Sequence, residues 1–242
     1  KKKGVAAESL DVFSDALNYN EMCSSSEFET IFMIPPSVIT DPHHAITKVT
    51  AELAHSNCSR ALLISSTGVY GQPKNAVVRA ETKPSPMDER TKKLVTIETN
   101  WLSGGTDFSV LRLAGIYGPG RIVGQGRLAA AEAIGGDPSA WLNLIHVADA
   151  ARLSLRCLNS DARAVELGAD GNAVKRADYY RHVAKLFGFP EPKFTDGEPG
   201  AAGEKSKRNV YSKKCDPSST FARLSWAPQF QDYVAGLRAS VA

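Results

Sequence analysis

The residues best suited to chemistry follow a short apolar run. Residues 61–64 are Ala-Leu-Leu-Ile, and residues 65–71 are Ser-Ser-Thr-Gly-Val-Tyr-Gly. In an open parallel sheet, a buried strand ends in this way at its carboxyl edge, where ligands bind. Ser66 and Tyr70 carry hydroxyl groups that can exchange a proton with a ligand, so they are the catalytic candidates. The alternative is a purely structural turn, in which the Tyr70 ring packs and its hydroxyl reaches water.

Other polar residues give weaker signals. Residues 108–120 form a second apolar run that ends in Gly-Pro-Gly, and Arg121 follows as a candidate contact for an anion on the substrate side. His146 precedes Asp149 by three residues, which suggests a helix N-cap more than a base or a metal ligand. The four cysteines lie far apart without a Cys-x-x-Cys pair, so we expect neither a metal site nor a disulfide framework.

Apolar periodicity places strands and helices in alternation along the chain. Such alternation predicts an α/β fold with a parallel sheet and right-handed crossovers. The strands at 28–34, 61–65 and 108–113 should be adjacent and parallel. Further strands are expected at 4–10, 142–145 and 165–167, helices at 41–55, 88–102, 128–134, 149–158 and 176–187, and a mobile loop at 190–209.

Four segments, taken together and in order, resemble one family. They are Ser-Ser-Thr-Gly-Val-Tyr-Gly at 65–71, Leu-Arg-Leu-Ala-Gly-Ile-Tyr-Gly-Pro-Gly at 111–120, His-Val-Ala-Asp at 146–149 and Leu-Ser-Trp-Ala-Pro at 224–228. The chain resembles the extended and atypical short-chain dehydrogenases/reductases, the NAD-dependent epimerase/dehydratase family. This resemblance implies one Rossmann-like, doubly wound domain over 1–242. The sheet core would cover about 1–140, and 141–242 would add the remaining strands and a small C-terminal substrate-side lobe.

The resemblance also assigns site positions. The cofactor candidates are Pro35, Ser65, Leu113 and Gly115, and Ser66 matches the family's substrate-side hydroxyl. The family moves protons with a Tyr-x-x-x-Lys pair on a helix. Here the two positions hold Arg90 and Leu94, and neither side chain can replace its counterpart. Lys92 and Lys93 are out of phase with the lysine position, because a helix turns about 100° per residue.

The family's glycine-rich pyrophosphate turn has no counterpart before residue 28. The sequence Gly-Gln-Gly-Arg-Leu-Ala at 124–129 has a G-x-G-x-x-A spacing, but it is better explained as a loop and a helix start. Aligned on the later motifs, these 242 residues lack the family's first strand, first helix and second strand. We therefore expect no cofactor for these residues alone, and NAD(P) if an upstream glycine-rich segment exists. An upstream segment or a protein partner would complete the sheet beside strand 28–34.

Composition narrows the class further. The net charge of +3 does not indicate nucleic-acid binding, and no apolar run reaches the length of a membrane span. We expect a soluble protein in a reducing intracellular compartment, either cytoplasm or an organelle interior. Three hypotheses remain. They are a catalytically silent structural or assembly subunit, an NAD(P)-dependent oxidoreductase or epimerase whose cofactor-binding part lies upstream, and a nucleotide-sensing binding module.

Overall fold

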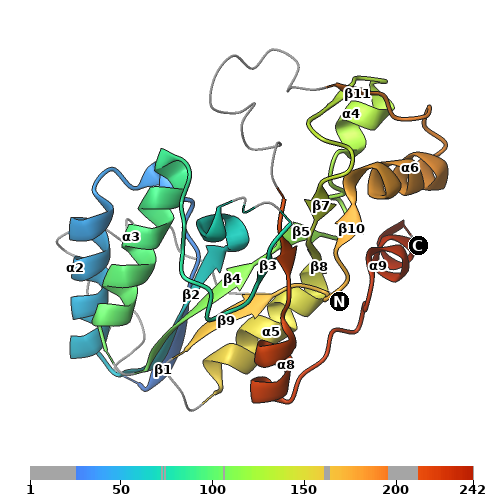
Figure 1. Ribbon diagram of the computed structural model, residues 1–242. Helices are drawn as coiled ribbons and strands as arrows, with labels where there is room; N and C mark the ends of the chain where they lie inside the picture. The colour runs from blue at the N-terminus through green and yellow to red at the C-terminus, as the bar shows by residue number, and fades with distance from the viewer. Residues whose placement is uncertain are drawn as a thin grey trace.

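A four-stranded parallel sheet forms the centre of the protein, as a computed structural model shows (Figure 1). The structure describes residues 26–71, 73, 75–105, 107–160, 164–195 and 212–241. The strands β1 (Phe28–Phe32), β2 (Cys58–Ser66), β4 (Phe108–Leu113) and β9 (Val165–Gly168) are arranged in the order β1-β2-β4-β9. The predicted adjacency and parallel direction of the first three strands are confirmed. The predicted strand at 4–10 lies outside the described residues.

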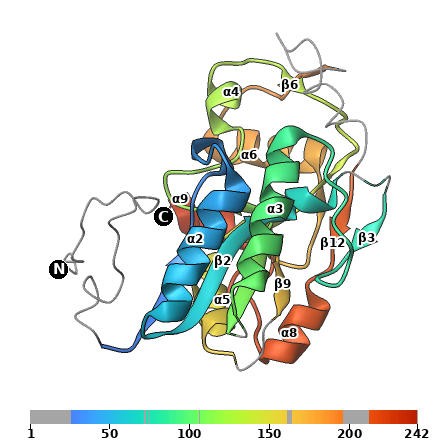
Figure 2. The same cartoon turned by 90° about the vertical axis from the view of Figure 1, so that its left-hand side faces the viewer.

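Helices cover both faces of this sheet. Helices α2 (Pro42–His55) and α3 (Glu89–Ser103) lie side by side on one face (Figure 2), and α5 (Val147–Leu158) packs on the other. Residues alternate along each strand, so Leu63 faces α2 and α3 while Leu62 faces α5. Trp101 of α3 is fully buried between Phe32 and Phe108. This arrangement confirms the Rossmann-like α/β class.

A smaller set of elements forms the lobe seen beside the sheet in Figure 1. Its core is aromatic, with Tyr117, Tyr179 and Tyr180 buried in one cluster. The elements are β5 (Gly115–Tyr117), α4 (Gln125–Ala129), β6 (Ile134–Gly135), β7 (Trp141–Leu142), β8 (Leu144–His146), β10 (Val174–Lys175), α6 (Arg176–Phe187), β11 (Phe194–Thr195) and α9 (Tyr233–Val241).

Short elements link the sheet to this lobe. The strand β3 (Val77–Val78) pairs in parallel with β12 (Lys214–Cys215), and α8 (Ser218–Leu224) follows. Two 3-10 turns, η1 (Pro36–Val38) and η2 (Thr67–Tyr70), follow β1 and β2. Among the described residues, no helix combines the length and the apolar character needed to cross a membrane.

Some predicted boundaries were wrong. The helix expected at 128–134 spans Gln125–Ala129 instead, and Ala131 has a φ of 53°, which a helix cannot continue through. Ile134 then begins β6. The strand expected at 142–145 is two strands, β7 and β8, which pair with different partners. Part of the expected loop at 190–209 forms β11, and the remainder from 196 lies outside the described residues.

Candidate functional site

The carboxyl ends of three strands lie level at one edge of the sheet. Ser66 of β2 is opposite Leu113 of β4, and Leu113 is opposite Gly168 of β9. Ligands of open α/β sheets bind at this edge. The predicted cofactor positions all lie at or just after strand ends here, and they are Pro35, Ser65, Leu113 and Gly115.

A tight turn follows β2 and carries the predicted hydroxyl groups. Ser66 is the N-cap of η2, and its Oγ accepts a hydrogen bond from the N–H of Gly68 (3.1 Å). Gly71 ends the turn at a φ of 64°, which favours glycine. Ser66 is half-buried, so its hydroxyl is placed at the rim of the strand edge and can still donate its hydrogen.

The structure directs Tyr70 inward. Only 1% of its surface is exposed, and its hydroxyl accepts a hydrogen bond from Nη1 of Arg112 (3.1 Å). The guanidinium of Arg112 also lies 4.9 Å from the centre of the Tyr70 ring. Burial raises the pKa of Tyr70, although Arg112 opposes the rise. The Tyr70 hydroxyl therefore bonds to Arg112 inside the protein.

A buried ion pair lies beneath the turn. Nη2 of Arg112 is 2.7 Å from Oε2 of Glu98 on α3, and the Ser65 hydroxyl donates to Oε1 of Glu98 (2.5 Å). Burial lowers the pKa of Arg112, but Glu98 and Tyr70 together raise it above its ordinary value, so the guanidinium stays charged. Our sequence reasoning did not identify this pair as part of the site. The available signal was a single arginine inside an otherwise uncharged buried strand.

Helix α3 brings Arg90 and Leu94, which the resemblance aligns with a proton-transfer pair, to this region. Asp88 and Thr91 form a capping box that fixes the start of the helix. Arg90 is exposed in the first turn, and its Nη1 lies 3.9 Å from where a Cβ on Gly68 would be. Ser66 Oγ lies 3.4 Å from the same point. The structure thus places the Arg90 guanidinium beside the Ser66 turn.

Leu94, one turn further along α3, is 5% exposed and belongs to an apolar cluster. The cluster fills the space beneath the strand edge where the resemblance places a lysine. Its other members include Val69, Tyr70, Ala114 and Cys215.

Arg121 lies far from the Ser66 turn in the sequence. It closes a different turn, which begins at Gly118. Its backbone exchanges two hydrogen bonds with Gly118 (2.9 and 3.1 Å), and its side chain is exposed. Within the described residues, that side chain forms no ion pair.

His146 caps α5, as predicted, through a hydrogen bond from the N–H of Ala148 (3.2 Å). Asp149 is fully buried and accepts from the N–H groups of Gln229 and Phe230.

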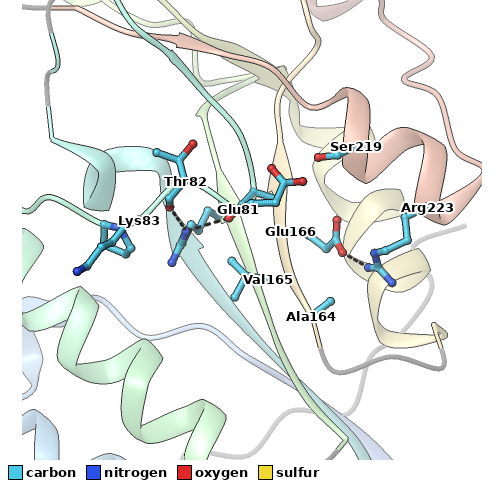
Figure 3. Close-up of a pocket in the computed structure, with 11 residues that line it drawn as sticks. Glu81, Thr82, Lys83, Ala164, Val165, Glu166, Ser219 and Arg223 are labelled. Carbon is cyan, nitrogen blue, oxygen red and sulfur yellow. Dashed lines mark hydrogen bonds and ion pairs between the residues drawn. The ribbon is translucent and has the colours of Figure 1, made fainter.

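A hollow of about 540 Å³ lies between the start of β9, the loop at 80–84 and α8, and Figure 3 shows the residues that line it. It lies beside Val165, at the start of this strand, and so away from the carboxyl edge. Some of its charged side chains are paired, because Glu166 contacts Arg223 and Arg112 donates to the carbonyls of Ala80 and Thr82. Glu81, Lys83 and Ser219 also line the hollow, but it lies away from the edge that carries the Ser66 turn.

These features define a Rossmann-like α/β fold, and comparison with solved structures agrees. MoeE5 in complex with UDP-glucose and NAD matches with a TM-score of 0.75 and 20% identity, covering 94% of this chain and 82% of that one. UDP-glucuronic acid 4-epimerase from Bacillus cereus in complex with NAD matches with a TM-score of 0.72 and 16% identity, covering 95% and 77%. The structural neighbours are thus proteins of the NAD-dependent epimerase/dehydratase family, as the sequence resemblance predicted.

Two further relatives have no function in their names. A functionally unknown conserved protein from Silicibacter pomeroyi DSS matches with a TM-score of 0.73 and 25% identity, covering 88% of this chain and 77% of that one. Protein YeeZ from Escherichia coli (strain K12) is 30% identical over 164 residues, 64% of this chain. The chain matches only 56% of the length of YeeZ. No protein-family model matches.

Proposed function

We propose that this chain is a catalytically silent epimerase/dehydratase-like protein that uses the tyrosine position to bind an anion. The observation that carries the proposal is the pair of residues on α3: Arg90 stands beside the Ser66 turn, and Leu94 is buried in an apolar cluster. A guanidinium is not a proton donor near neutral pH, and leucine has no polar group.

The two lysines of α3 support this interpretation, because neither takes the place of the missing lysine. Lys92 pairs with Glu89 of the same helix (2.7 Å). Lys93 donates to the carbonyl of Ile39 (3.2 Å), beyond the end of β1. Neither ammonium is therefore directed into the cluster around Leu94, where the resemblance puts the ribose-binding lysine.

Arg90 and Ser66 together suit a carboxylate or phosphate group. A guanidinium offers several N–H donors in a planar fork, and a neighbouring hydroxyl adds another donor. Within the described residues, the Arg90 side chain has no ion-pair partner, so its charge is available to a ligand. The position at the carboxyl edge of β2 is also where an α/β sheet binds ligands.

We further propose that β1 is covered by a strand from an upstream segment or a protein partner, as a structural or assembly subunit would require. In the described residues, β1 pairs only with β2. Met33 and Val38, just beyond its carboxyl end, are 67% and 63% exposed. An open parallel edge next to exposed apolar side chains favours association.

An NAD(P)-dependent oxidoreductase or epimerase is the second candidate, and a nucleotide-sensing module is the third. Both are favoured by the level strand ends at Ser66, Leu113 and Gly168 and by neighbours whose structures contain NAD. Both need a pyrophosphate-binding turn from outside these residues. A fluorescence titration of the full-length protein with NADH or NADPH separates these candidates from a purely structural subunit, because only the two candidates should bind the cofactor.

Titration with inorganic phosphate tests the anion site. We expect amide NMR shifts at Ser66 and Gly68 that saturate in the wild type and disappear in Arg90→Met. Lys92→Met is the matched control, because it removes a neighbouring positive charge that faces Glu89. Equal binding by the wild type and Arg90→Met contradicts the proposal.

A further inference from the structure

A segment far along the chain lies against the Ser66 turn. The N–H of Asn75 donates to the carbonyl of Ser212 (2.7 Å), and β12 continues the pairing by running parallel to β3. We call residues 212–216 the strap. It therefore crosses the loop that leaves the turn at the carboxyl edge of β2.

The strap is also held from the side of the lobe. The side-chain amide of Asn143, between β7 and β8, donates to the carbonyl of Lys213 (2.9 Å). The same amide accepts from the N–H of Cys215 (2.7 Å). Two hydrogen bonds from one side chain fix the strap in register, so the side chains of Lys213 and Cys215 have defined positions.

Lys213 is 6% exposed, which is unusual for a lysine. Its Nζ donates to the carbonyl of Gly71 (2.7 Å) at the end of the Ser66 turn. Within the described residues, no carboxylate pairs with it, and the thiol of Cys215 is the titratable group that acts on it. A buried ammonium without a counter-charge is costly, so its presence is not explained by packing.

Hydrogen bonds continue from Lys213 to the site. The N–H of Gly71 donates to the carbonyl of Gly68 (3.0 Å), and the N–H of Gly68 donates to Oγ of Ser66 (3.1 Å). Only glycine fits at the end of this turn, because a Cβ at position 71 would lie 2.3 Å from the carbonyl oxygen of Ser85. The ammonium thus holds one end of a short, constrained turn whose other end is the Ser66 hydroxyl.

We propose that Lys213 is a positioning residue: its charged ammonium fixes the Gly71 carbonyl and so holds the Ser66 hydroxyl opposite Arg90. The strap would couple the lobe, through Asn143, to the geometry of the anion site. The role of the turn rests on the proposed function, but the position of the turn can be measured without a ligand.

The expected pH response follows from burial. Burial lowers the pKa of Lys213, so its proton is lost at a lower pH than that of exposed lysines. Once neutral, the amine is a weaker donor to Gly71. We therefore expect the turn to loosen as pH rises through this pKa, before the exposed lysines titrate.

NMR of the full chain tests the proposal in two ways. The carbonyl ¹³C shift of Gly71 should show an inflection below the pH range of exposed lysines, and Lys213→Arg should remove it because arginine stays charged. Lys213→Met should raise amide exchange at Gly68 and Gly71 at least tenfold relative to Leu62 and Leu111. Lys214→Met, whose side chain instead lies on Trp141, is the control and should change neither measurement.

Three results overturn the proposal. One is a Gly71 carbonyl without an inflection below the range of exposed lysines. Another is unchanged exchange at Gly68 and Gly71 in Lys213→Met. The third is an equal rise at all amides, which indicates a general loss of stability. If Lys213→Met does not fold, the wild-type titration and Lys213→Arg still decide the question. Phosphate binding tests Arg90 separately, so this proposal and the proposed function can fail independently.

Discussion

Glu98 of α3 and Arg112 of β4 form a buried ion pair directly beneath the candidate site, with 2.7 Å between Oε2 and Nη2. The carboxylate also accepts from Nε of Arg112 (3.1 Å), and Nη1 of the arginine reaches the Tyr70 hydroxyl. The pair connects a helix, a strand and the Ser66 turn. Breaking one member leaves a buried charge without its partner.

Glu98→Gln should therefore lower the free energy of unfolding by about 3–5 kcal/mol. Tyr70→Phe is the matched control, because it removes one hydrogen bond and should cost about 1 kcal/mol. Urea unfolding of both variants measures the difference. Similar losses in the two variants would contradict a strongly coupled pair.

The raised pKa of the buried Asp170 carboxyl predicts that the stability of the protein depends on pH. Asp170 is 4% exposed, its Oδ1 accepts from the N–H of Asn172 (2.9 Å), and burial raises its pKa to about 7. The nearby carboxylates of Asp232 and Asp149 contribute to this rise in pKa, and the hydrogen bond from Asn172 opposes it. An aspartate in the unfolded chain has a pKa of about 3.9. The contribution of the Asp170 carboxyl to the free energy of unfolding is therefore fully present below that pH and is lost as pH rises to about 7.

Asp170→Asn should remove this dependence. Relative to the variant, the wild type should lose about 2 kcal/mol of unfolding free energy between pH 5 and pH 8. Urea midpoints over this range provide the measurement. Parallel profiles for the two proteins would show that the Asp170 carboxyl has an ordinary pKa.

The tyrosine and lysine of the proton-transfer pair that the resemblance aligns with Arg90 and Leu94 should have different effects on stability when introduced there. Leu94→Lys places an ammonium in a cluster of buried apolar side chains, and we expect a loss of about 3 kcal/mol or more in unfolding free energy. Arg90→Tyr, at an exposed position, should change stability by less than about 0.5 kcal/mol. Thermal unfolding compares the two variants, and a stable Leu94→Lys protein would show that the cluster admits a charge.

The edge of β1 predicts association. Residues 1–242 expressed alone should self-associate or fail to melt cooperatively, because the strand lacks a second neighbour in the described sheet. If a partner chain covers the edge, the contact should be obligate and bury at least about 2,000 Å² in total. Analytical ultracentrifugation with thermal melting tests this, and a soluble, cooperatively melting monomer would contradict it.

The sequence was most informative where apolar runs are long and end sharply. The strand Phe108–Leu113 and the helix Arg176–Phe187 were predicted to the residue. The first is fully buried, and the second ends at Gly188, whose φ of 69° terminates a helix. The strand β5 was missed, because a three-residue strand has too little periodicity to stand out from a turn, and its partner β8 was predicted only as part of one strand at 142–145.

Much of the candidate site depends on contacts between distant segments. Lys213 reaches Gly71 across 142 positions of the chain, and Arg112 reaches Tyr70 across 42. No local pattern shows such contacts. The motif alignment, by contrast, placed Ser66 and Arg90 on separate elements that the fold then brings to the same turn.

Turnover by the full-length protein tests the central claim most directly. Oxidation of NADH or NADPH, and epimerisation of a UDP-sugar in the presence of NAD, should stay at the level of the uncatalysed reaction, because Arg90 and Leu94 stand at the positions that the resemblance assigns to the acid/base pair. Turnover that disappears in Ser66→Ala or Tyr70→Phe would contradict a catalytically silent site.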